Sequence, residues 1–445
     1  MMPDRSEGDI NLTPARAAWA AQNLDAETRR LLDADARVFL HQSLSSPCLH
    51  AIRSAAGSSF IDVTGRTYLD FHGNNVHQVG FSHPRVVAAI RAQMDSLSFC
   101  TRRYTCEPAV RFAEELVSIA PRGLTRVLLA PGGTTAVGMA LKLARVATGR
   151  FKFISLWDSF HGASLDAISV GGEAAFRRGI GPLLPGCEHA PPPDPPHCPF
   201  RCGASCSLAC ADYIEYMLEK EGDVAAVIGE TVRATPFIPP PGYWQRIRAA
   251  CDKHGALLIL DEIPMGLGRT GKMFACEHFG VAPDILVLGK GLGGGIFPLA
   301  AMLCREELNR AANISLGHYT HEKNPVACAA GLATLQIIAD ENLVTRAHTL
   351  GERTKTALRE LAARHPLIAD VRGLGLALGV ELRVEKNSDV AERVMYAALA
   401  RGLNFKVTMG SILTLTPALT ITDAEMDHAL EILDASLAAE NSPPM

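Results

Sequence analysis

The sequence predicts an α/β fold with a large domain on a mostly parallel sheet and a smaller α+β domain. Between residues 125 and 304, short apolar runs typical of buried strands alternate with stretches of helical periodicity, the pattern of a parallel sheet covered on both faces. Hydrophobic residues make up 48% and charged residues 20% of the chain, as in ordinary globular proteins. At 445 residues the chain is longer than one core usually serves, so we expect more than one lobe.

The elements are expected in the following order. Residues 1 to 45 are expected to be helical and to form an arm, because no glycine or proline occurs from Ala15 to Ser43. A hairpin around Thr64 and Gly65 and a helix from 83 to 97 come next. Strands of the large domain are expected at residues 125–130, 151–157, 224–230, 256–262, 285–290 and 299–304, with helices at 134–148 and 243–255.

Two segments interrupt or end this alternation. Residues 181 to 211 contain three consecutive prolines, so we expect a surface excursion there. After residue 335 the pattern changes to a helix at 346–366, a glycine-bearing strand pair at 371–382, a further helix and a strand at 412–419. The predicted domain limits are therefore 1–75 for an N-terminal arm and part of the small domain, 76–335 for the large domain, and 336–445 for the C-terminal small domain.

Charge and hydropathy limit the partners. The net charge is −4 and no block of basic residues occurs, so we expect no nucleic-acid partner. No run of 18 apolar residues occurs and residues 1–40 lack the apolar segment of a signal peptide. We therefore expect no membrane partner and a cytoplasmic location, in which the 12 cysteines are reduced thiols.

Four cysteines recur at every fourth residue with two histidines nearby. Thiolate and imidazole are the preferred ligands of zinc, but equally spaced cysteines also fit one face of a short helix, and we expect no metal. The set consists of Cys198, Cys202, Cys206 and Cys210, with His189 and His197.

Lys290 is the strongest candidate for chemistry. It ends an apolar run, and four of the next five residues are glycines. A lysine between a buried strand and a tight turn suits covalent catalysis through an imine, although a lysine at a strand end can also reach water through its long side chain. Asp261 ends another apolar run, and the carboxyl ends of parallel strands share one edge of a sheet. It could equally cap the next helix.

Two further segments suit a cofactor. Gly132, Gly133, Thr134 and Thr135 lie between a strand and a helix, where free backbone N–H groups favour a phosphate, although threonine also caps helices without a ligand. The strand at 151–157 leads to Phe160 and His161, an aromatic pair that could cover a planar ring or belong to the core.

The chain from residue 55 onward resembles the class III aminotransferases. The resemblance rests on GRTYLDF, GFSHPRVVAAIRAQ, GGTTAVGMALKLAR, SFHG, VIGETV, the block from LLILDEIPMGLGRTG to LVLGKGLGGGIFPLAA, NPVACAAGLATL, VRGLGLALGVEL and LTPALTIT. It implies fold type I with a seven-stranded sheet and pyridoxal 5′-phosphate (PLP) as cofactor, held through a Schiff base on Lys290. It also implies a small-molecule amine substrate and a homodimer with shared active sites, which could assemble further.

The resemblance assigns roles to single residues. Asp261 looks like the partner of the pyridine nitrogen, Phe160 like the aromatic on the ring, and Glu230 like the acid of the family's Glu-Pro-Val segment near the substrate. Thr320 looks like the threonine that reaches the phosphate of the neighbouring subunit. The expected catalytic residues are Lys290, Asp261 and Glu230, and the expected cofactor-binding residues are Gly133, Thr134, Phe160, His161, Asp261, Lys290 and Thr320.

Departures from the family pattern favour elimination over amino transfer. Thr320 is followed by His321-Glu322-Lys323 where the family has an aromatic and two glycines, and Thr231 replaces the proline after Glu230. The segments FHGNNVHQVGFSHP, RRYTCEPAV, PPPDPPHCPF and GHYTHEKNP are similar to the subgroup of (R)-1-hydroxy-2-aminoethylphosphonate ammonia-lyases, which release phosphonoacetaldehyde and ammonia.

The sequence is also compatible with three other functions. A class III aminotransferase acting on an ω-amine or amino acid with a keto-acid acceptor is the main alternative, although no arginine for the acceptor stands out and only Lys406 offers a cation in the C-terminal stretch. An aminomutase and a non-catalytic PLP- or zinc-binding regulator are the others. Candidates by residue type for the acid that assists the leaving hydroxide and for the phosphonate ligands are Arg102, Arg103, His77, His321 and Lys323. Each could equally be a surface charge or a residue of a dimer interface.

Overall fold

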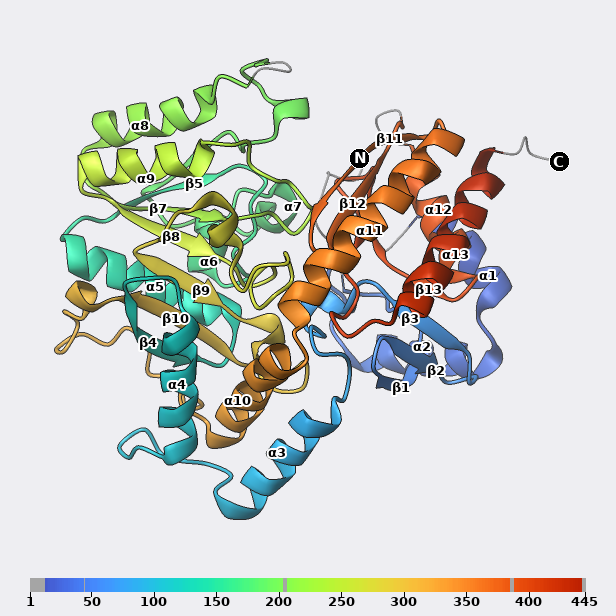
Figure 1. Ribbon diagram of the computed structural model, residues 1–445, viewed down its shortest axis with the longest axis horizontal. Coiled ribbons are helices and arrows are strands. Elements are labelled where there is room, and N and C mark those ends of the chain that lie inside the picture. Colours follow the sequence, from blue (N-terminus) through green and yellow to red (C-terminus); the bar gives the residue numbers. More distant parts are fainter. Residues whose placement is uncertain (1–12, 44, 203–205, 385–387, 442–445) are drawn as a thin grey trace.

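The computed structural model describes residues 13–43, 45–202, 206–384 and 388–441. Two lobes lie side by side, with a seven-stranded sheet in the left lobe of Figure 1 and two smaller sheets in the right lobe. The large sheet has the order β4-β10-β9-β8-β7-β5-β6. Only β10 runs antiparallel to its neighbours, which confirms the predicted mostly parallel sheet and the α/β fold.

The strands of the large sheet lie at the predicted runs, with one addition. β4 is Leu124–Ala130, β5 Lys152–Leu156, β6 Cys187–Ala190, β7 Val224–Glu230, β8 Leu257–Asp261, β9 Ile285–Leu288 and β10 Ala300–Arg305. The prediction that residues 181–211 are only a surface excursion is wrong, because β6 lies inside this range and pairs in parallel with β5. Four residues suffice for an edge strand, and the prolines that follow end it.

Both faces of the sheet are covered, as the near-continuous apolar strands predict. Alternate residues of one strand pack on opposite sides, so Leu286 and Leu288 of β9 belong to one core cluster and Ile285 and Val287 to the other. The helices of the large lobe are α3 Pro84–Ser96, α4 Glu107–Ile119, α5 Gly133–Thr148, α6 Leu165–Val170, α7 Ala174–Arg177, α8 Ala209–Glu221, α9 Tyr243–His254 and α10 Pro325–Asp340.

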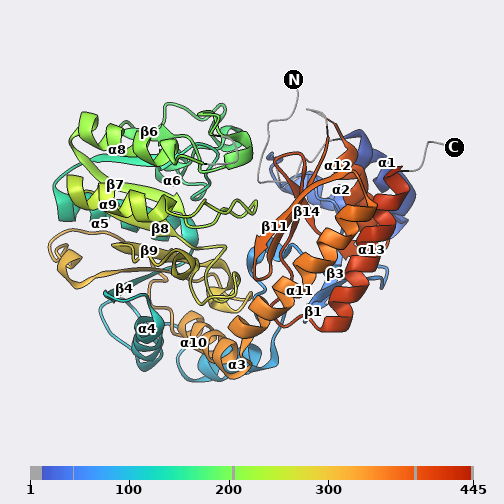
Figure 2. The same cartoon turned by 45° about the horizontal axis from the view of Figure 1, so that its top comes forward.

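The small lobe contains the predicted hairpin and C-terminal elements. Its first sheet has the order β1-β2-β3-β13 and its second the order β11-β12-β15-β14, and α11 continues from α10 along this lobe in Figure 2. The bounds are β1 Ile52–Ala56, β2 Ser59–Asp62, β3 Thr67–Asp70, β11 Ile368–Leu374, β12 Ala377–Leu382, β13 Leu403–Asn404, β14 Lys406–Thr408, β15 Ile412–Leu415, α11 Leu343–Arg364, α12 Val390–Leu399 and α13 Asp423–Asn441. The predicted domain limits stay a prediction.

The N-terminal segment forms two helices. α1 is Pro14–Asn23 and α2 is Ala26–Val38, and Asp25 separates them because its carboxylate caps α2 by accepting the Thr28 N–H at 2.8 Å. Trp19 of α1 packs on Tyr396 of α12, with ring centroids 5.8 Å apart. The predicted arm therefore contacts the small lobe of its own chain.

Short 3-10 turns complete the chain, and no helix of the described residues is long and apolar enough to span a membrane. The turns are η1 Gly73–Asn75, η2 Pro195–His197, η3 Ala275–Phe279, η4 Lys290–Gly293 and η5 Glu306–Leu308.

Glu262, the residue after β8, fixes the loop that leads to η3. Its side chain is buried and accepts hydrogen bonds from the Ala275 N–H at 2.6 Å, the Cys276 N–H at 2.7 Å and the Thr231 hydroxyl at 3.0 Å. Burial raises the pKa of the Glu262 carboxyl group to about 7, against the opposing effect of these three donors.

We expect Glu262 to make stability fall as pH rises through the range from its unfolded to its folded pKa. In that range the unfolded carboxyl group ionises while the folded one keeps its proton, so the folded state binds more protons. Relative to that of Glu262→Gln, the unfolding midpoint of the wild type should therefore fall from about pH 4.5 to pH 7 and then stay constant. Thermal unfolding across this range measures it, with the exposed Glu360→Gln as control. Parallel curves for wild type and Glu262→Gln would contradict the assignment.

Candidate active site

The predicted site residues meet at the carboxyl edge of the large sheet. Glu230 ends β7, Asp261 ends β8 and Lys290 follows β9, and the loop after β5 and the start of α5 close the space between them. A cavity of about 180 Å³ lies there. Its lining residues are Gly133, Thr134, Phe160, His161, Gly162, Glu230, Asp261, Ile263, Pro264 and Lys290. Every predicted site residue except Thr320 is among them.

Lys290 lies at a turn with an unusual backbone. Its φ of 50° is in the left-handed region, which costs a non-glycine residue about 1–3 kcal/mol and is found most often at functional sites. The next residue is glycine because a Cβ at Gly291 would lie 1.6 Å from the amide oxygen of Gln78. A strained backbone conformation thus places Lys290 at the cavity.

Asp261 is a buried carboxylate held in one orientation. Its Oδ2 lies 2.8 Å from His161 Nδ1 and its Oδ1 accepts the Ile263 N–H at 3.0 Å. A carboxylate fixed in this way at a cavity wall suits a partner that carries a proton on a ring nitrogen. The sequence did not predict the contact between Asp261 and His161, since 100 residues separate them.

The part of the cavity wall at the start of α5 suits an anion. α5 begins at Gly133, and the first N–H groups of a helix have no partner within it. The Thr134 hydroxyl lies 2.8 Å from the Ser164 hydroxyl and accepts the Ser164 N–H at 3.2 Å. Gly162 has a φ of 128°, and a Cβ there would lie 2.3 Å from Thr134 Oγ1, so only glycine lets this loop approach the helix.

Phe160 and Glu230 line the same cavity and are hydrogen-bonded to each other. The Phe160 N–H donates to Glu230 Oε1 at 3.1 Å, and the Phe160 ring packs on Phe176 with centroids 4.4 Å apart. Glu230 is 6% exposed. An aromatic ring fixed from behind can cover one face of a planar group.

The other candidates lie elsewhere in this chain. Thr320, His321 and Lys323 are exposed, and Arg102 contacts His318 at 2.7 Å. None of these four lines the cavity. The predicted role of Thr320 at a neighbouring subunit stays a prediction.

The remaining basic candidates are also spread out. His77 is buried, with its Nε2 3.1 Å from the Asp70 carbonyl oxygen, and Lys406 is buried in β14. Arg103 is exposed.

The four cysteines do not lie on one short helix, so this reading is wrong. Cys198 and Cys202 precede α8, with sulfur atoms 3.8 Å apart, and Cys210 lies in it. A hydrogen bond with Ser207 lowers the pKa of the Cys202 thiol to about 7. Among the described residues, no three His, Cys, Asp or Glu side chains gather as metal ligands would. The predicted lack of a metal stays a prediction.

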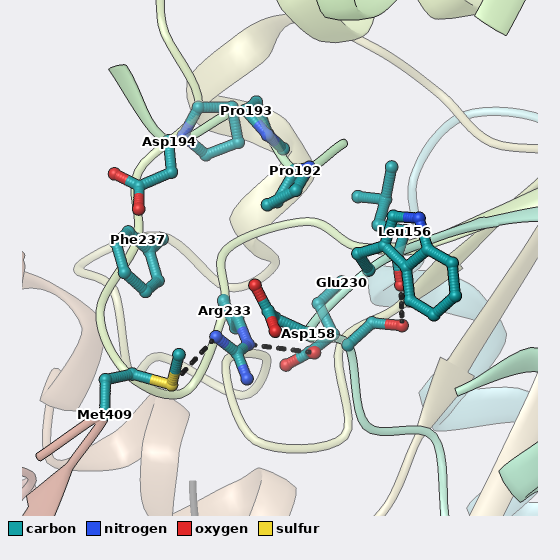
Figure 3. A pocket seen from close by; sticks show the side chains of 12 residues that line it. Leu156, Asp158, Pro192, Pro193, Asp194, Glu230, Arg233, Phe237 and Met409 are labelled. Atoms are coloured by element: carbon teal, nitrogen blue, oxygen red, sulfur yellow. Dashed lines mark hydrogen bonds and ion pairs between the residues drawn. The ribbon is translucent and has the colours of Figure 1, made fainter. Parts of the chain in front are cut away.

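Sequence reasoning missed Arg233. It lies three residues after Glu230 and is 7% exposed. Its Nη2 donates to Glu173 Oε2 at 3.2 Å, and its Nε lies 3.9 Å from Glu230 Oε1. Figure 3 shows its guanidinium group between Glu230 and Met409, in a second cavity that also borders Glu230. In the sequence, Arg233 was marked only by its position three residues after Glu230, an acid at the end of a predicted strand.

Comparisons with known proteins agree with this geometry. Residues 41–437 match the family model of class-III aminotransferases. The chain is 48% identical to the (R)-1-hydroxy-2-aminoethylphosphonate ammonia-lyase of Vibrio splendidus, over 98% of this chain and 95% of that one. It is 38% identical to the acetylornithine aminotransferase of Methanopyrus kandleri, over 86% of this chain and 93% of that one.

Solved structures show the same fold. A transaminase from the marine bacterium Virgibacillus is 27% identical, with a TM-score of 0.87, over 93% of this chain and 99% of that one. A PLP-bound amine transaminase from an uncultivated Pseudomonas species is 31% identical, with a TM-score of 0.83, over 90% of this chain and 98% of that one. From the family match and these relatives, the chain belongs to the class III aminotransferase family of PLP-dependent, fold type I enzymes.

Proposed function

We propose that the protein is an ammonia-lyase that converts (R)-1-hydroxy-2-aminoethylphosphonate to phosphonoacetaldehyde and ammonia. The identity of 48% over 98% of the chain with a relative of that name carries the proposal. Amino transfer to a keto acid is the second candidate, which the names of the solved structures favour.

The cavity fits PLP in charge and shape. The start of α5 at Gly133 and Thr134 would hold the phosphate, Asp261 would hold the protonated ring nitrogen, and Phe160 would cover one face of the ring. Lys290 would carry the covalent link. When bound, PLP supplies an electron sink for negative charge on the carbon next to the substrate nitrogen.

The residues of the chain supply the proton transfers around this sink. The Lys290 amine would take a proton from the aminomethyl carbon, and the hydroxyl group on the neighbouring carbon would leave as hydroxide. This proton and the hydroxide together make one water. Asp261 would face the ring nitrogen, and the contact with His161 fixes its orientation. One water is lost in the elimination, and one water is consumed when the enamine is hydrolysed. The substrate therefore yields one aldehyde and one ammonia without a second substrate.

We also propose a homodimer in which Thr320 reaches the partner's cofactor phosphate. The segment around Thr320 is joined to residues near 100, since His321 meets Phe99 edge to face with centroids 5.5 Å apart. Phe99, Tyr104 and Ile314 expose large apolar side chains in these segments, as a subunit interface would require.

The lyase should release ammonia over many turnovers without any keto acid. The purified holoenzyme is incubated with racemic 2-amino-1-hydroxyethylphosphonate, and ammonia and aldehyde are measured. A lyase gives equal amounts of both, far above the enzyme concentration. Product that stops at about one equivalent per active site and resumes when a keto acid is added would show amino transfer instead.

Replacing Lys290 with alanine should abolish covalent attachment of the cofactor. Borohydride reduction of the wild-type holoenzyme, followed by peptide mass spectrometry, should place the added mass on Lys290. The variant should lose both this label and the near-visible absorbance band of the bound cofactor. Lys406→Ala, which removes another buried lysine, serves as the control and should keep the label on Lys290. A label that persists in the Lys290 variant contradicts the assignment.

The dimer should appear in light scattering at about twice the chain mass of 47.6 kDa, or at a multiple of the dimer. Tyr104→Glu places a charge in the proposed interface and should reduce both the dimer and the activity. A fully active monomer would contradict shared sites.

A further inference from the structure

A second cavity adjoins the cofactor cavity, and Glu230 lines both. It has a volume of about 40 Å³, enough for a small group of atoms but not for a second planar ring. Trp157, Pro192, Phe237 and Met409 form its apolar walls, as Figure 3 shows in part.

Arg233 is the only cation that lines this cavity among the described residues. Its guanidinium lies 5.8 Å from the centre of the Phe237 ring, so the positive charge is held against apolar and aromatic surface. Charge and hydrogen bonds act strongly in such surroundings, because little water is present to screen them.

The donors of Arg233 are only partly used. Nη2 donates to Glu173 Oε2 at 3.2 Å. Nη1 meets only the thioether of Met409, at 3.4 Å, and a thioether is a weak acceptor. Nε is buried without a hydrogen-bond acceptor, since Glu230 Oε1 lies 3.9 Å away. Nη1 can therefore donate to an oxyanion, which is a stronger acceptor than the thioether.

The acids around the cavity do not use these donors. Glu173 balances the charge of Arg233, and Asp194 is held by His197 Nδ1 at 2.9 Å. Because Asp158 and Asp194 also line the cavity, its net charge does not attract anions. Selection instead depends on the fixed guanidinium group, whose Nη1 can donate to an oxygen of a phosphonate or carboxylate.

We propose that Arg233 binds the phosphonate of the substrate in this cavity and so sets its specificity for an anionic amine. This inference rests on the proposed function. The amine end of the substrate would face Lys290, and the phosphonate would replace the Met409 thioether as the acceptor of Arg233. Glu173 would hold the guanidinium in place.

Two probes of similar length test the role of Arg233 without any turnover. 2-Aminoethylphosphonate carries the anion and has no hydroxyl to eliminate, whereas propylamine lacks the anion. Each is titrated into the holoenzyme, and the change in cofactor absorbance gives an apparent Kd. The wild type should bind 2-aminoethylphosphonate more tightly.

Arg233→Lys keeps the charge and removes the planar guanidinium group. The double variant Arg233→Gln/Glu173→Gln removes the Arg233–Glu173 ion pair as a whole, so that the buried Glu173 carboxylate does not keep its charge without Arg233. In both variants the apparent Kd for 2-aminoethylphosphonate should rise about tenfold to a hundredfold, as expected when a charge-assisted hydrogen bond is lost. The Kd for propylamine should stay within about twofold.

Arg372→Gln is the matched control. Arg372 lies 5.2 Å from the centre of the same Phe237 ring but is bound to Asp370 and Glu381 and does not line the cavity. It should leave the ratio of the two Kd values unchanged. Equal losses for both probes in the Arg233 variants, or no loss for either, would overturn the proposal.

The two proposals can fail separately. If the wild type releases no ammonia from 2-amino-1-hydroxyethylphosphonate but the Arg233 variants bind 2-aminoethylphosphonate selectively more weakly, the lyase proposal fails and the phosphonate site stands. If ammonia release is normal and the ratio of Kd values does not change, only the assignment of Arg233 fails.

Discussion

The register between β7 and β8 is the constraint on which the site depends. Glu230 and Asp261 are direct partners in this parallel pair, and Asp261 is the partner of Val287 in β9. Because side chains alternate between the faces of a strand, a slip by one residue would turn these carboxylates away from the cavity. The apolar residues that fill both faces of β9 and its neighbours hold this register, so the core of the large lobe also fixes the distances within the site.

Glu230 lines two cavities that suit different chemical groups. On one side, the start of α5, Asp261 and Lys290 surround a cavity that would suit the cofactor of any class III enzyme. On the other side, Arg233, Phe237 and Met409 line a second cavity, which we propose binds the anionic group of the substrate. The substrate that the enzyme accepts would then depend on what the second cavity holds next to the first.

Much of this arrangement could be predicted from the sequence because strand ends are local features. Lys290 and Asp261 each end an apolar run, and parallel strands bring such ends to one edge. β6 was missed because a four-residue edge strand before prolines gives almost no periodic signal. Arg233 was missed for a different reason: its burial and its partner Glu173, 60 residues earlier in the chain, arise only from tertiary packing. The role proposed for Thr320 would require a second subunit, so the structure of one chain does not contain the contacts that it would make.

The product that forms from the substrate tests the account most directly. Phosphorus and carbon NMR of the reaction with (R)-1-hydroxy-2-aminoethylphosphonate show whether the carbon next to phosphorus keeps its hydroxyl group. Elimination predicts phosphonoacetaldehyde, in which this carbon is a methylene and ammonia is released in equal amount. An aldehyde that keeps the hydroxyl group, formed only when a keto acid is present, would contradict the account and identify an aminotransferase.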